Sequence, residues 1–318
     1  MQKLRLFQYF WAVNYLYIFV IFVSPIKFIT PNFKACMSSI SQLLKENNPH
    51  EDILAIAGSL GEKENIPTYI VGGYVRDTLL GKSCKDIDIM VEGDGVAFAK
   101  KLARELKVNV TVDYDKFGTA MIPYPDVEIE VATARIEKYR SDSRKPEVTS
   151  STIEEDMSRR DFTINAIAAS LLPSSFGELY DPFGGIKDLQ KGLIITPLDP
   201  DETFSDDPLR MLRAVRFAAQ LEYDVASTIL ESISRNINRL EIVSWERIRD
   251  EIIKSLTTNK PSIAFYLMKE TGLLTHVFPE MDIMSGVETI NGMGHKDVFI
   301  HTLQVVDNAA KLSDKMEI

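Results

Sequence analysis

The chain has 318 residues, of which 45% are hydrophobic, and its formal net charge is −10. This length allows two or three domains, and the apolar content is enough for packed cores. Two cysteines, Cys36 and Cys84, give no disulfide framework, so we expect a reducing, cytoplasmic environment, and the acidic balance excludes a surface coated uniformly for nucleic acid.

The first 36 residues form an apolar extension. Residues 6–23 are apolar and aromatic, with Gln8 and Asn14 as interruptions, and their number is close to the minimum for a membrane span. Three interpretations compete: a membrane anchor, a secretory signal, and upstream sequence joined by a wrongly chosen start codon. We favour the last, because Met37 opens an ordinary soluble helix and the chain beyond it is cytosolic in character, so a membrane partner is not expected.

Sequence periodicity predicts an α+β fold, in which a small sheet-bearing head domain is followed by an all-helical neck and body. After N-terminal helices in residues 37–66, the head (67–173) should contain strands at 69–71, 86–91, 108–112, 118–122 and 127–132, and helices at 74–80 and 96–106. Residues 140–160 are expected to form a mobile loop that leads to a helix holding residues 159–166. Further helices are expected at 186–191, 207–221, 224–236, 245–256, 261–271 and 297–312.

A diglycine turn and two aspartates carry the chemistry of the head. Gly72 and Gly73 follow a short buried strand and let the backbone turn with free N–H groups, as an anion-binding nest requires. Asp86 and Asp88 lie two apart on the next strand, so they share one face and can hold the same metal. Mg²⁺ prefers such oxygen ligands, with phosphates as further partners, and Arg76 would lie near those phosphates.

Two further groups of charged residues accompany this turn. Glu128 or Glu130, also two apart on a strand, could complete a three-carboxylate site, or both could face water on an edge strand. A local basic cluster forms either a nucleic-acid patch or a solvated loop. Its members are Arg135, Lys138, Arg140, Arg144, Lys145, Arg159 and Arg160.

A second candidate site opens the helix predicted at 207–221. Asp207 is placed as an N-cap and Pro208 at the first helical position, which is a purely structural explanation. Asp207 and Arg210 are also neighbours on one helical face. A carboxylate accepts from an exocyclic amine and a guanidinium donates to a ring nitrogen or carbonyl, so the pair could read cytosine and adenine and reject guanine and uracil. Arg213 lies one turn further and could reach a phosphate.

Five motifs in this order resemble the class II tRNA nucleotidyltransferases, which add CCA to tRNA 3′ ends, and the related bacterial poly(A) polymerases. The resemblance runs from about Tyr69 to Glu280. The motifs are Gly72-Gly73-Tyr-Val-Arg76-Asp77 with Asp86-Ile-Asp88; Arg159-Arg160-Asp161 with Asn165; Asp181-Pro-Phe-Gly-Gly185 with Lys187-Asp188-Leu189; Asp206-Asp207-Pro-Leu-Arg210 with Arg213; and Gly272-Leu-Leu through Phe278-Pro-Glu280.

The resemblance implies roles for these residues. Asp86 and Asp88 would bind two Mg²⁺ ions, and Glu130 matches a family carboxylate position better than Glu128. Arg160 and Asp161 would bind the incoming ribose, and Asp207 and Arg210 would act as a protein template for CTP and ATP at the tRNA 3′ end. The implied nucleotide-binding set is Gly72, Gly73, Arg76, Arg160, Asp161, Asn165, Asp207, Arg210 and Arg213. The family usually has Glu where Asp206 stands, which weakens any role for Asp206.

The resemblance also sets expected boundaries and leaves alternatives open. Residues 174–285 would form a helical neck and body with template and RNA-binding motifs, and residues 286–318 resemble the start of an HD domain. His301 would be the first HD metal ligand, but no His-Asp dipeptide follows, so no working HD metal site is expected. A poly(A) polymerase using ATP, a catalytically lapsed RNA- or nucleotide-binding fragment, and a membrane-tethered regulatory protein are the alternatives.

Overall fold

The computed structural model describes residues 38–318, except 47, 85, 109–111, 115–117, 141–142, 287–288, 291–292, 295–296 and 317–318. The described residues belong to one compact unit, Ser38–Ile318. The apolar extension and its three interpretations lie outside them, as does Met37. No helix in this described part of the chain combines the length and apolarity needed to cross a bilayer.

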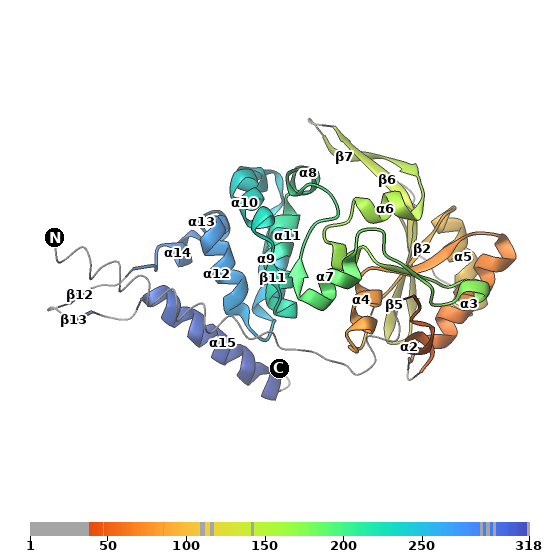
Figure 1. Ribbon diagram of the computed structural model, residues 1–318, viewed down its shortest axis with the longest axis horizontal. Coiled ribbons are helices and arrows are strands. Elements are labelled where there is room, and N and C mark those ends of the chain that lie inside the picture. Colours follow the sequence, from red (N-terminus) through yellow and green to blue (C-terminus); the bar gives the residue numbers. More distant parts are fainter. Residues whose placement is uncertain are drawn as a thin grey trace. The chain divides into compact units, whose positions relative to one another are not determined.

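The first half of the unit is built on a seven-stranded sheet with strand order β3-β4-β5-β2-β1-β8-β9 (Figure 1). Strands β2 and β5 run parallel, and every other neighbouring pair in this sheet is antiparallel. The strands are β1 (Thr68–Val71), β2 (Asp86–Val91), β3 (Val112–Tyr114), β4 (Thr119–Tyr124), β5 (Val127–Thr133), β8 (Ala168–Ser170) and β9 (Leu179–Tyr180). The accompanying helices are α2 (Ser41–Lys45), α3 (Glu51–Glu64), α4 (Gly73–Leu79), α5 (Gly95–Glu105) and α6 (Ile153–Ser158), with 3₁₀ turns η3 (Thr163–Asn165) and η4 (Pro173–Ser175).

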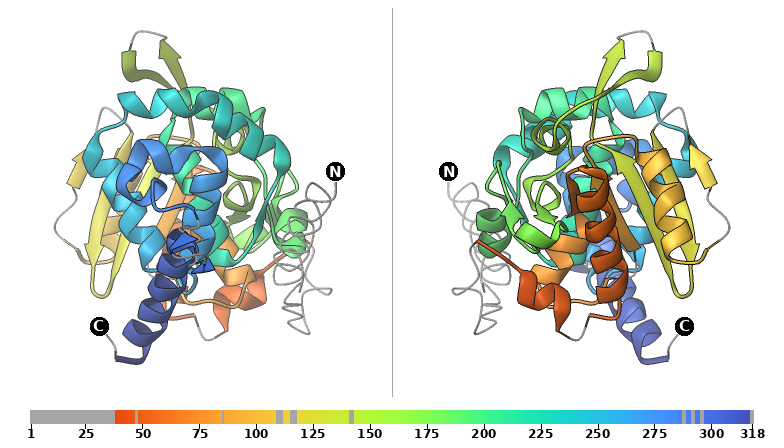
Figure 2. Two further views of the ribbon diagram at one scale, coloured as in Figure 1. Left: turned by 90° about the vertical axis from the view of Figure 1, so that its left-hand side faces the viewer. Right: turned by 90° about the vertical axis from the view of Figure 1, so that its right-hand side faces the viewer.

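Helices α3 and α5 lie side by side over one face of this sheet (Figure 2). Asp94 begins α5 by accepting from the N–H of Ala97, and the apolar face of α5 buries Phe98 and Leu102 completely or nearly so. Helix α3 packs closely against the backbone at Leu171, since a Cβ on Gly58 would lie 1.8 Å from the carbonyl oxygen of that residue. One sheet face is therefore closed by helices.

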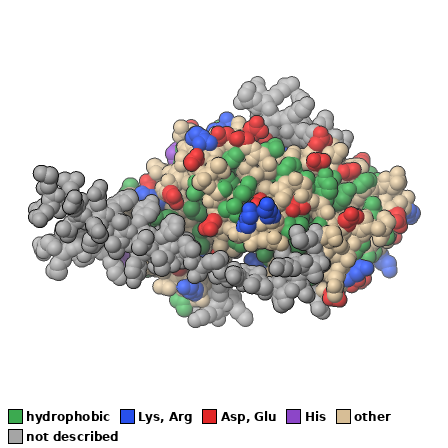
Figure 3. All heavy atoms as spheres, viewed as in Figure 1, with side chains coloured by type: hydrophobic (Ala, Val, Ile, Leu, Met, Phe, Trp, Pro, Cys, Tyr) green, Lys and Arg blue, Asp and Glu red, His purple; other side chains and the backbone are tan. Residues whose placement is uncertain are grey.

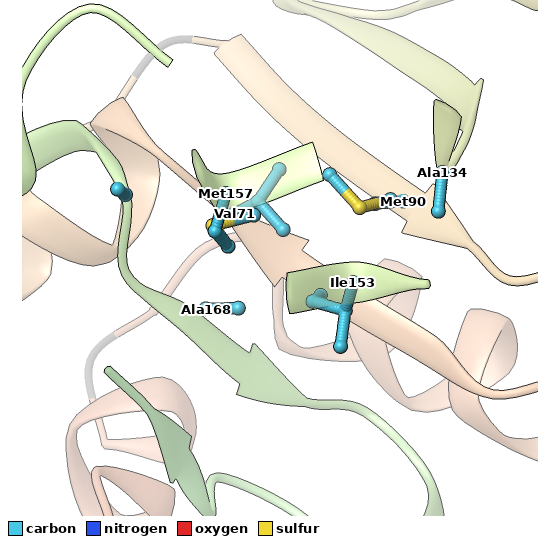
Figure 4. Packing of buried hydrophobic residues seen from close by; sticks show 7 residues of the cluster. Val71, Met90, Ala134, Ile153, Met157 and Ala168 are labelled. Atoms are coloured by element: carbon cyan, nitrogen blue, oxygen red, sulfur yellow. The ribbon is translucent and has the colours of Figure 1, made fainter. Parts of the chain in front are cut away.

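A smaller apolar cluster covers part of the opposite face (Figure 4). It consists of Val71, Met90, Ala134, Ile153, Met157, Ala166 and Ala168. Met90 lies two residues after Asp88 and so on the same face of β2. The cluster therefore covers the C-terminal end of β2 and leaves the N-terminal end, with its aspartates, to polar neighbours.

The mobile loop predicted at 140–160 is wrong. Strand β6 (Arg135–Arg140) pairs antiparallel with β7 (Ser143–Ser150) in a separate two-stranded sheet, and α6 follows. Pro146 lies within β7, although proline has no backbone N–H and is disfavoured inside a sheet. In a two-stranded sheet both strands are edges, so the missing N–H of Pro146 is tolerated. The side chains of residues 136–150 lie outside the described part of the chain, so the basic patch at Lys138–Lys145 stays a prediction.

The predicted helix over residues 159–166 is also wrong, because α6 ends at Ser158. The carboxylate of Asp161 accepts from the following N–H, that of Phe162 (2.8 Å), and from the side-chain amide of Asn165 (3.0 Å). Such local side-chain acceptors compete with helical hydrogen bonds. Residues 159–162 therefore form a tight turn, followed by the short η3.

The second half of the unit is helical, as predicted, and agrees closely with the expected ranges. No helix was foreseen at 200–206, 237–242, 273–277 or 279–282, no strand was foreseen at 193–194, 289–290 or 293–294, and residues 224–225, expected to be helical, form a strand. Of the strand expected at 108–112, residues 109–111 lie outside the described part of the chain, and the observed strand begins at Val112. The helices are α7 (Gly185–Lys191), α8 (Pro200–Asp206), α9 (Leu209–Leu221), α10 (Ser227–Asn236), α11 (Trp245–Leu256), α12 (Pro261–Thr271), α13 (Leu273–Val277), α14 (Pro279–Asp282) and α15 (Val298–Met316), with η5 (Ile237–Ile242) and two short strand pairs, β10 (Leu193–Ile194) with β11 (Asp224–Val225) and β12 (Thr289–Ile290) with β13 (Met293–Gly294).

Candidate active site

Four acidic side chains project from the sheet face opposite α3 and α5. In the parallel pair of β2 and β5, Asp88 stands in register with Glu130, and Asp86 with Glu128. The alternate residue Ile87 is fully buried on the other face. Because in-register residues of neighbouring strands point the same way, the two aspartates share a face with both glutamates.

Electrostatics distinguishes Asp88 and Glu130 from the other two carboxylates. Burial raises the pKa of Asp88; the charge of Arg160 opposes that shift, whereas the charge of Asp86 adds to it. Burial and the neighbouring charge of Asp88 likewise raise the pKa of Glu130. The negative charges of Asp88 and Glu130 therefore lie close together and are partly shielded from water. A bound cation would relieve their repulsion.

The donor set fits Mg²⁺ only in company with a ligand. Among the residues that the structure describes, no group of three or more His, Cys, Asp or Glu is arranged to hold a metal ion by itself. Mg²⁺ is commonly bound by one or two carboxylates together with phosphate oxygens and water. Asp86 and Asp88, on one face of one strand, fit that mode.

The diglycine turn begins α4 beside this face. Gly72 has φ +66°, and a Cβ there would lie 2.7 Å from Nη1 of Arg160, so only glycine admits the guanidinium. The N–H of Gly72 donates to the carbonyl of Ile167 (3.0 Å), so it is not free as the nest hypothesis expected. The first bond within α4 runs from the N–H of Arg76 to the carbonyl of Gly72, which leaves residues 73–75 to present their N–H groups.

Arg160 is held over this turn by a residue that the motifs did not reveal. Asp156, which is 1% exposed, accepts from Nε of Arg160 (3.2 Å) and forms an ion pair with Arg159. The i, i+3 and i, i+4 spacing of these residues was the available signal, but it presupposes a helix end at this point. Asp156 thereby orients Arg160 toward Gly72 and Asp88.

One series of hydrogen bonds joins the head to the helical body. It runs through Arg76, Asn165, Asp161 and Arg213. Arg76 is 5% exposed; it binds Asp77 with two nitrogens and donates to Oδ1 of Asn165 (2.6 Å). Asn165 donates to Asp161, which accepts from Nε of Arg213 (2.8 Å). Burial would raise the pKa of Asp161, but Arg213 and the Asn165 hydrogen bond outweigh it and lower that pKa.

Phe217 packs beside this series of hydrogen-bonded residues and was not foreseen as a site residue. The guanidinium carbons of Arg216, Arg76 and Arg213 lie 4.0, 5.2 and 5.4 Å from its ring centroid, within range of cation–π attraction. Phe162 packs edge-on against the same ring. Arg213 and Phe217 are four residues apart on α9, so their spacing was an available signal, whereas only the fold brings Arg76 to the same ring.

The start of α9 places the second candidate pair next to the Arg159 turn. The prediction that Asp207 is the N-cap and Pro208 the first helical residue is wrong by one position, because Pro208 is the N-cap of α9. Oδ1 of Asp207 accepts from the N–H of Leu209 (3.1 Å), and its Oδ2 accepts from Arg247 of α11 (2.9 Å). Arg210 donates to the carbonyl of Arg159 (2.6 Å). Asp207 and Arg210 thus both belong to the junction between the Arg159 turn and the helices.

The motif around Gly185 has a structural explanation. Asp181 accepts from the N–H groups of Gly185 (2.6 Å) and Ile186 (3.0 Å), which fixes the start of α7. Asp188 accepts from the hydroxyl of Thr163 (2.8 Å). A Cβ on Gly185 would lie 2.0 Å from the carbonyl oxygen of Thr163. This motif therefore holds α7 against η3.

Two family models match the chain. Residues 68–195 match the poly A polymerase head domain, and residues 222–284 match the probable RNA and SrmB-binding site of polymerase A. These ranges contain the carboxylate face, the diglycine turn, and helices α10 to α14.

Similar proteins carry related names. The chain is 34% identical over 268 residues to an A-adding tRNA nucleotidyltransferase of Geobacter sulfurreducens (83% of this chain, 28% of that protein) and 35% identical over 257 residues to a multifunctional CCA protein of Nitrosomonas europaea (79% and 59%). It superposes on the Thermotoga maritima CCA-adding enzyme complexed with tRNA at 36% identity and a TM-score of 0.67, covering 77% of this chain and 58% of that one. The chain spans less than two thirds of each of these relatives.

Proposed function

Because the chain belongs to the family of tRNA nucleotidyltransferases and poly(A) polymerases, we propose that it adds C and A to tRNA 3′ ends from CTP and ATP, in the cytoplasm. One observation carries the proposal. Asp86 and Asp88 share the sheet face that also bears Glu130, next to the glycine turn over which Arg160 lies. This is the placement that nucleotidyl transfer requires of metal ligands and phosphate-binding groups.

In the proposed reaction the terminal 3′ oxygen of the RNA bonds to the α-phosphorus, and the bond to the β-phosphate breaks to release pyrophosphate. Asp86 and Asp88 would hold Mg²⁺, and Glu130, in register with Asp88, would add negative charge next to it. When bound, Mg²⁺ would lower the pKa of the attacking hydroxyl and stabilise the leaving phosphates. The protein's own contribution is positioning and charge neutralisation.

Arg160 and the first turn of α4 would bind the triphosphate. Arg160 is oriented by Asp156 and reaches the space above Gly72, where its charge opposes the burial that raises the pKa of Asp88. The N–H groups of residues 73–75 precede the first helical bond and can donate to phosphate oxygens. The backbone N–H groups from Gly73 onward would donate to the phosphates and the charge of Arg160 would neutralise them, while Gly72 makes room for the Arg160 guanidinium.

Four predicted nucleotide-binding residues have protein partners in this structure. They form the series of hydrogen bonds described above, each residue bonding to the next: Arg76, Asn165, Asp161 and Arg213. We propose that they act on the nucleotide by fixing the glycine turn against α9. Their direct contact with ribose or phosphate stays a prediction.

Asp207 and Arg210 would read the base. Asp207 keeps acceptor capacity beyond its bonds to Leu209 and Arg247, and Arg210 has donors beyond the one used on Arg159. Cytosine and adenine both present an exocyclic amine beside an unprotonated ring nitrogen, which matches this acceptor and donor. Arg210→Ala should therefore raise incorporation of GTP and UTP relative to CTP and ATP, and unchanged selectivity would reject the template role.

A second candidate is addition of A alone. The Geobacter sulfurreducens relative is named an A-adding tRNA nucleotidyltransferase, so this chain could extend only a tRNA that already ends in C-C. Poly(A) addition is the third possibility, because the head-domain model is named after poly A polymerase.

One assay separates these reactions. The purified chain is given Mg²⁺, labelled CTP or ATP, and either tRNA lacking CCA, tRNA ending in C-C, or unrelated RNA. CCA addition predicts use of CTP and then ATP on the first tRNA; A addition predicts ATP use on the second alone; poly(A) addition predicts ATP use on all RNA 3′ ends. Absence of incorporation with every RNA would reject the proposed catalysis and favour a lapsed binding fragment.

A further inference from the structure

A polar cavity opens in the helical body, between the C-terminal ends of α9 and α11. Its volume is about 370 Å³, and it is lined by Arg216, Gln220, Lys254, Thr257, Thr258 and Asn259. The proposed reaction uses none of these residues. A volume of this size lies within the range of small-ligand sites.

Arg216 forms the buried wall of the cavity. It is 7% exposed; its Nε donates to Glu251 (2.5 Å) and its Nη1 to Oε1 of Gln220 (2.6 Å). No side chain or carbonyl of the described residues accepts from Nη2. Arg216 lines the cavity, and a guanidinium held on two sides with further N–H groups left to donate is a preorganised donor.

Three of the remaining polar side chains of the cavity also offer N–H donors. Gln220 has used its oxygen on Arg216, which leaves its amide nitrogen, and Lys254 and Asn259 contribute further N–H groups at the exposed rim. The hydroxyls of Thr257 and Thr258 already donate to carbonyls within the last turn of α11. The two cationic side chains exceed the single carboxylate of Glu251, so the local charge is positive.

We propose that this cavity binds a phosphate group, held by Arg216, Gln220, Lys254 and Asn259. A ligand here must supply acceptors and negative charge, and phosphate oxygens supply both. The group could belong to an RNA backbone or to a free phosphate anion such as pyrophosphate. On the face of the molecule seen in Figure 3, acidic side chains are spread widely and basic ones occur in separate small groups.

The cavity is connected to the candidate active site through side chains. Glu251 binds Arg216 and lies 4.0 Å from Arg213, which in turn holds Asp161. A phosphate on Arg216 would compete with Glu251 for its charge. The site nevertheless goes beyond the proposed function, because it needs neither Mg²⁺ nor a reacting nucleotide.

The test uses full-length protein carrying Asp86→Ala and Asp88→Ala, without divalent metal, so that incorporation plays no part. Binding of inorganic pyrophosphate is measured by calorimetry, and binding of an RNA hairpin by fluorescence anisotropy at several salt concentrations. Lys254→Gln is compared with Lys101→Gln, since both lysines are exposed (61% and 46%) but Lys101 lies on α5. Both substitutions should leave the unfolding midpoint unchanged.

Lys254→Gln should weaken binding about threefold, and Lys101→Gln should not. Weaker binding of pyrophosphate alone assigns the site to a free anion. Weaker binding of the hairpin, with a salt slope reduced by about one, assigns it to the RNA backbone. Equal affinities in the two variants, whether both are unchanged or both are reduced, would overturn the proposal and leave the catalytic proposal untouched.

Discussion

Replacing Gly72 by alanine perturbs the backbone turn and Arg160 together. The backbone at Gly72 has φ +66° and ψ −126°, a region that costs other residues roughly 1–3 kcal/mol. The new Cβ would also lie 2.7 Å from Nη1 of Arg160, which must move away from its place over the turn. Losing one charge-assisted contact to phosphate should weaken ATP binding about tenfold.

Gly81→Ala is the matched control. Gly81 has φ +68°, and a Cβ there would meet nothing within 4 Å, so only the backbone cost of roughly 1–2 kcal/mol applies. Urea unfolding should show both variants folded, with Gly72→Ala destabilised at least as much as Gly81→Ala. Calorimetric titration with ATP and Mg²⁺ should show weaker binding for Gly72→Ala alone. Equal ATP affinities would refute the role assigned to Arg160 above the turn.

Three further substitutions have defined outcomes. Asp88→Asn should abolish incorporation, and it should leave the unfolding midpoint at pH 7 unchanged or raise it. The raised pKa of Asp88 means that its carboxyl group stabilises the fold in acid and that this stability is lost as the pH rises through that pKa. A large drop in the midpoint would contradict this. Asp161→Ala should cost about 3 kcal/mol in urea unfolding at neutral pH, since its buried pair is broken, and this cost should shrink as acid protonates the wild-type carboxylate through its lowered pKa; a cost independent of pH would refute it. Gly185→Ala should unfold far more readily than Gly184→Ala in thermal melts, because only the former drives a Cβ into the backbone of Thr163, and equal midpoints would disprove that contact.

The sheet was predictable where one face is buried. Apolar alternation in 86–91 and 127–132 predicted β2 and β5, because a period of two fixes which residues turn inward. The same period put Asp86 and Asp88 on one face before any partner strand was known. Register was not accessible, so the choice between Glu128 and Glu130 as the neighbour of Asp88 needed the pairing itself.

The turn at 159–165 was not predictable from local pattern. Its conformation depends on Asp161, whose local hydrogen bonds replace helical ones and whose pairing with Arg213 comes from a helix about fifty residues away. Asp156 escaped notice because its spacing to Arg159 and Arg160 is informative only once the end of α6 is known, and Phe217 because Arg76 reaches its ring only after α9 has packed. Sequence motifs predicted the metal-binding carboxylates, and the fold supplied side chains, such as Asp156, that hold neighbouring groups in place.

Metal binding tests the central claim most directly, because the account requires Asp86 and Asp88 to converge on a cation beside a nucleoside triphosphate. Mn²⁺ binding, followed by electron paramagnetic resonance, is compared with and without a non-hydrolysable ATP analogue in the wild type and in Asp86→Ala and Asp88→Ala variants. The account predicts that the analogue tightens Mn²⁺ binding in the wild type and that each substitution removes this gain. Undiminished nucleotide-dependent Mn²⁺ binding in both folded variants would contradict it.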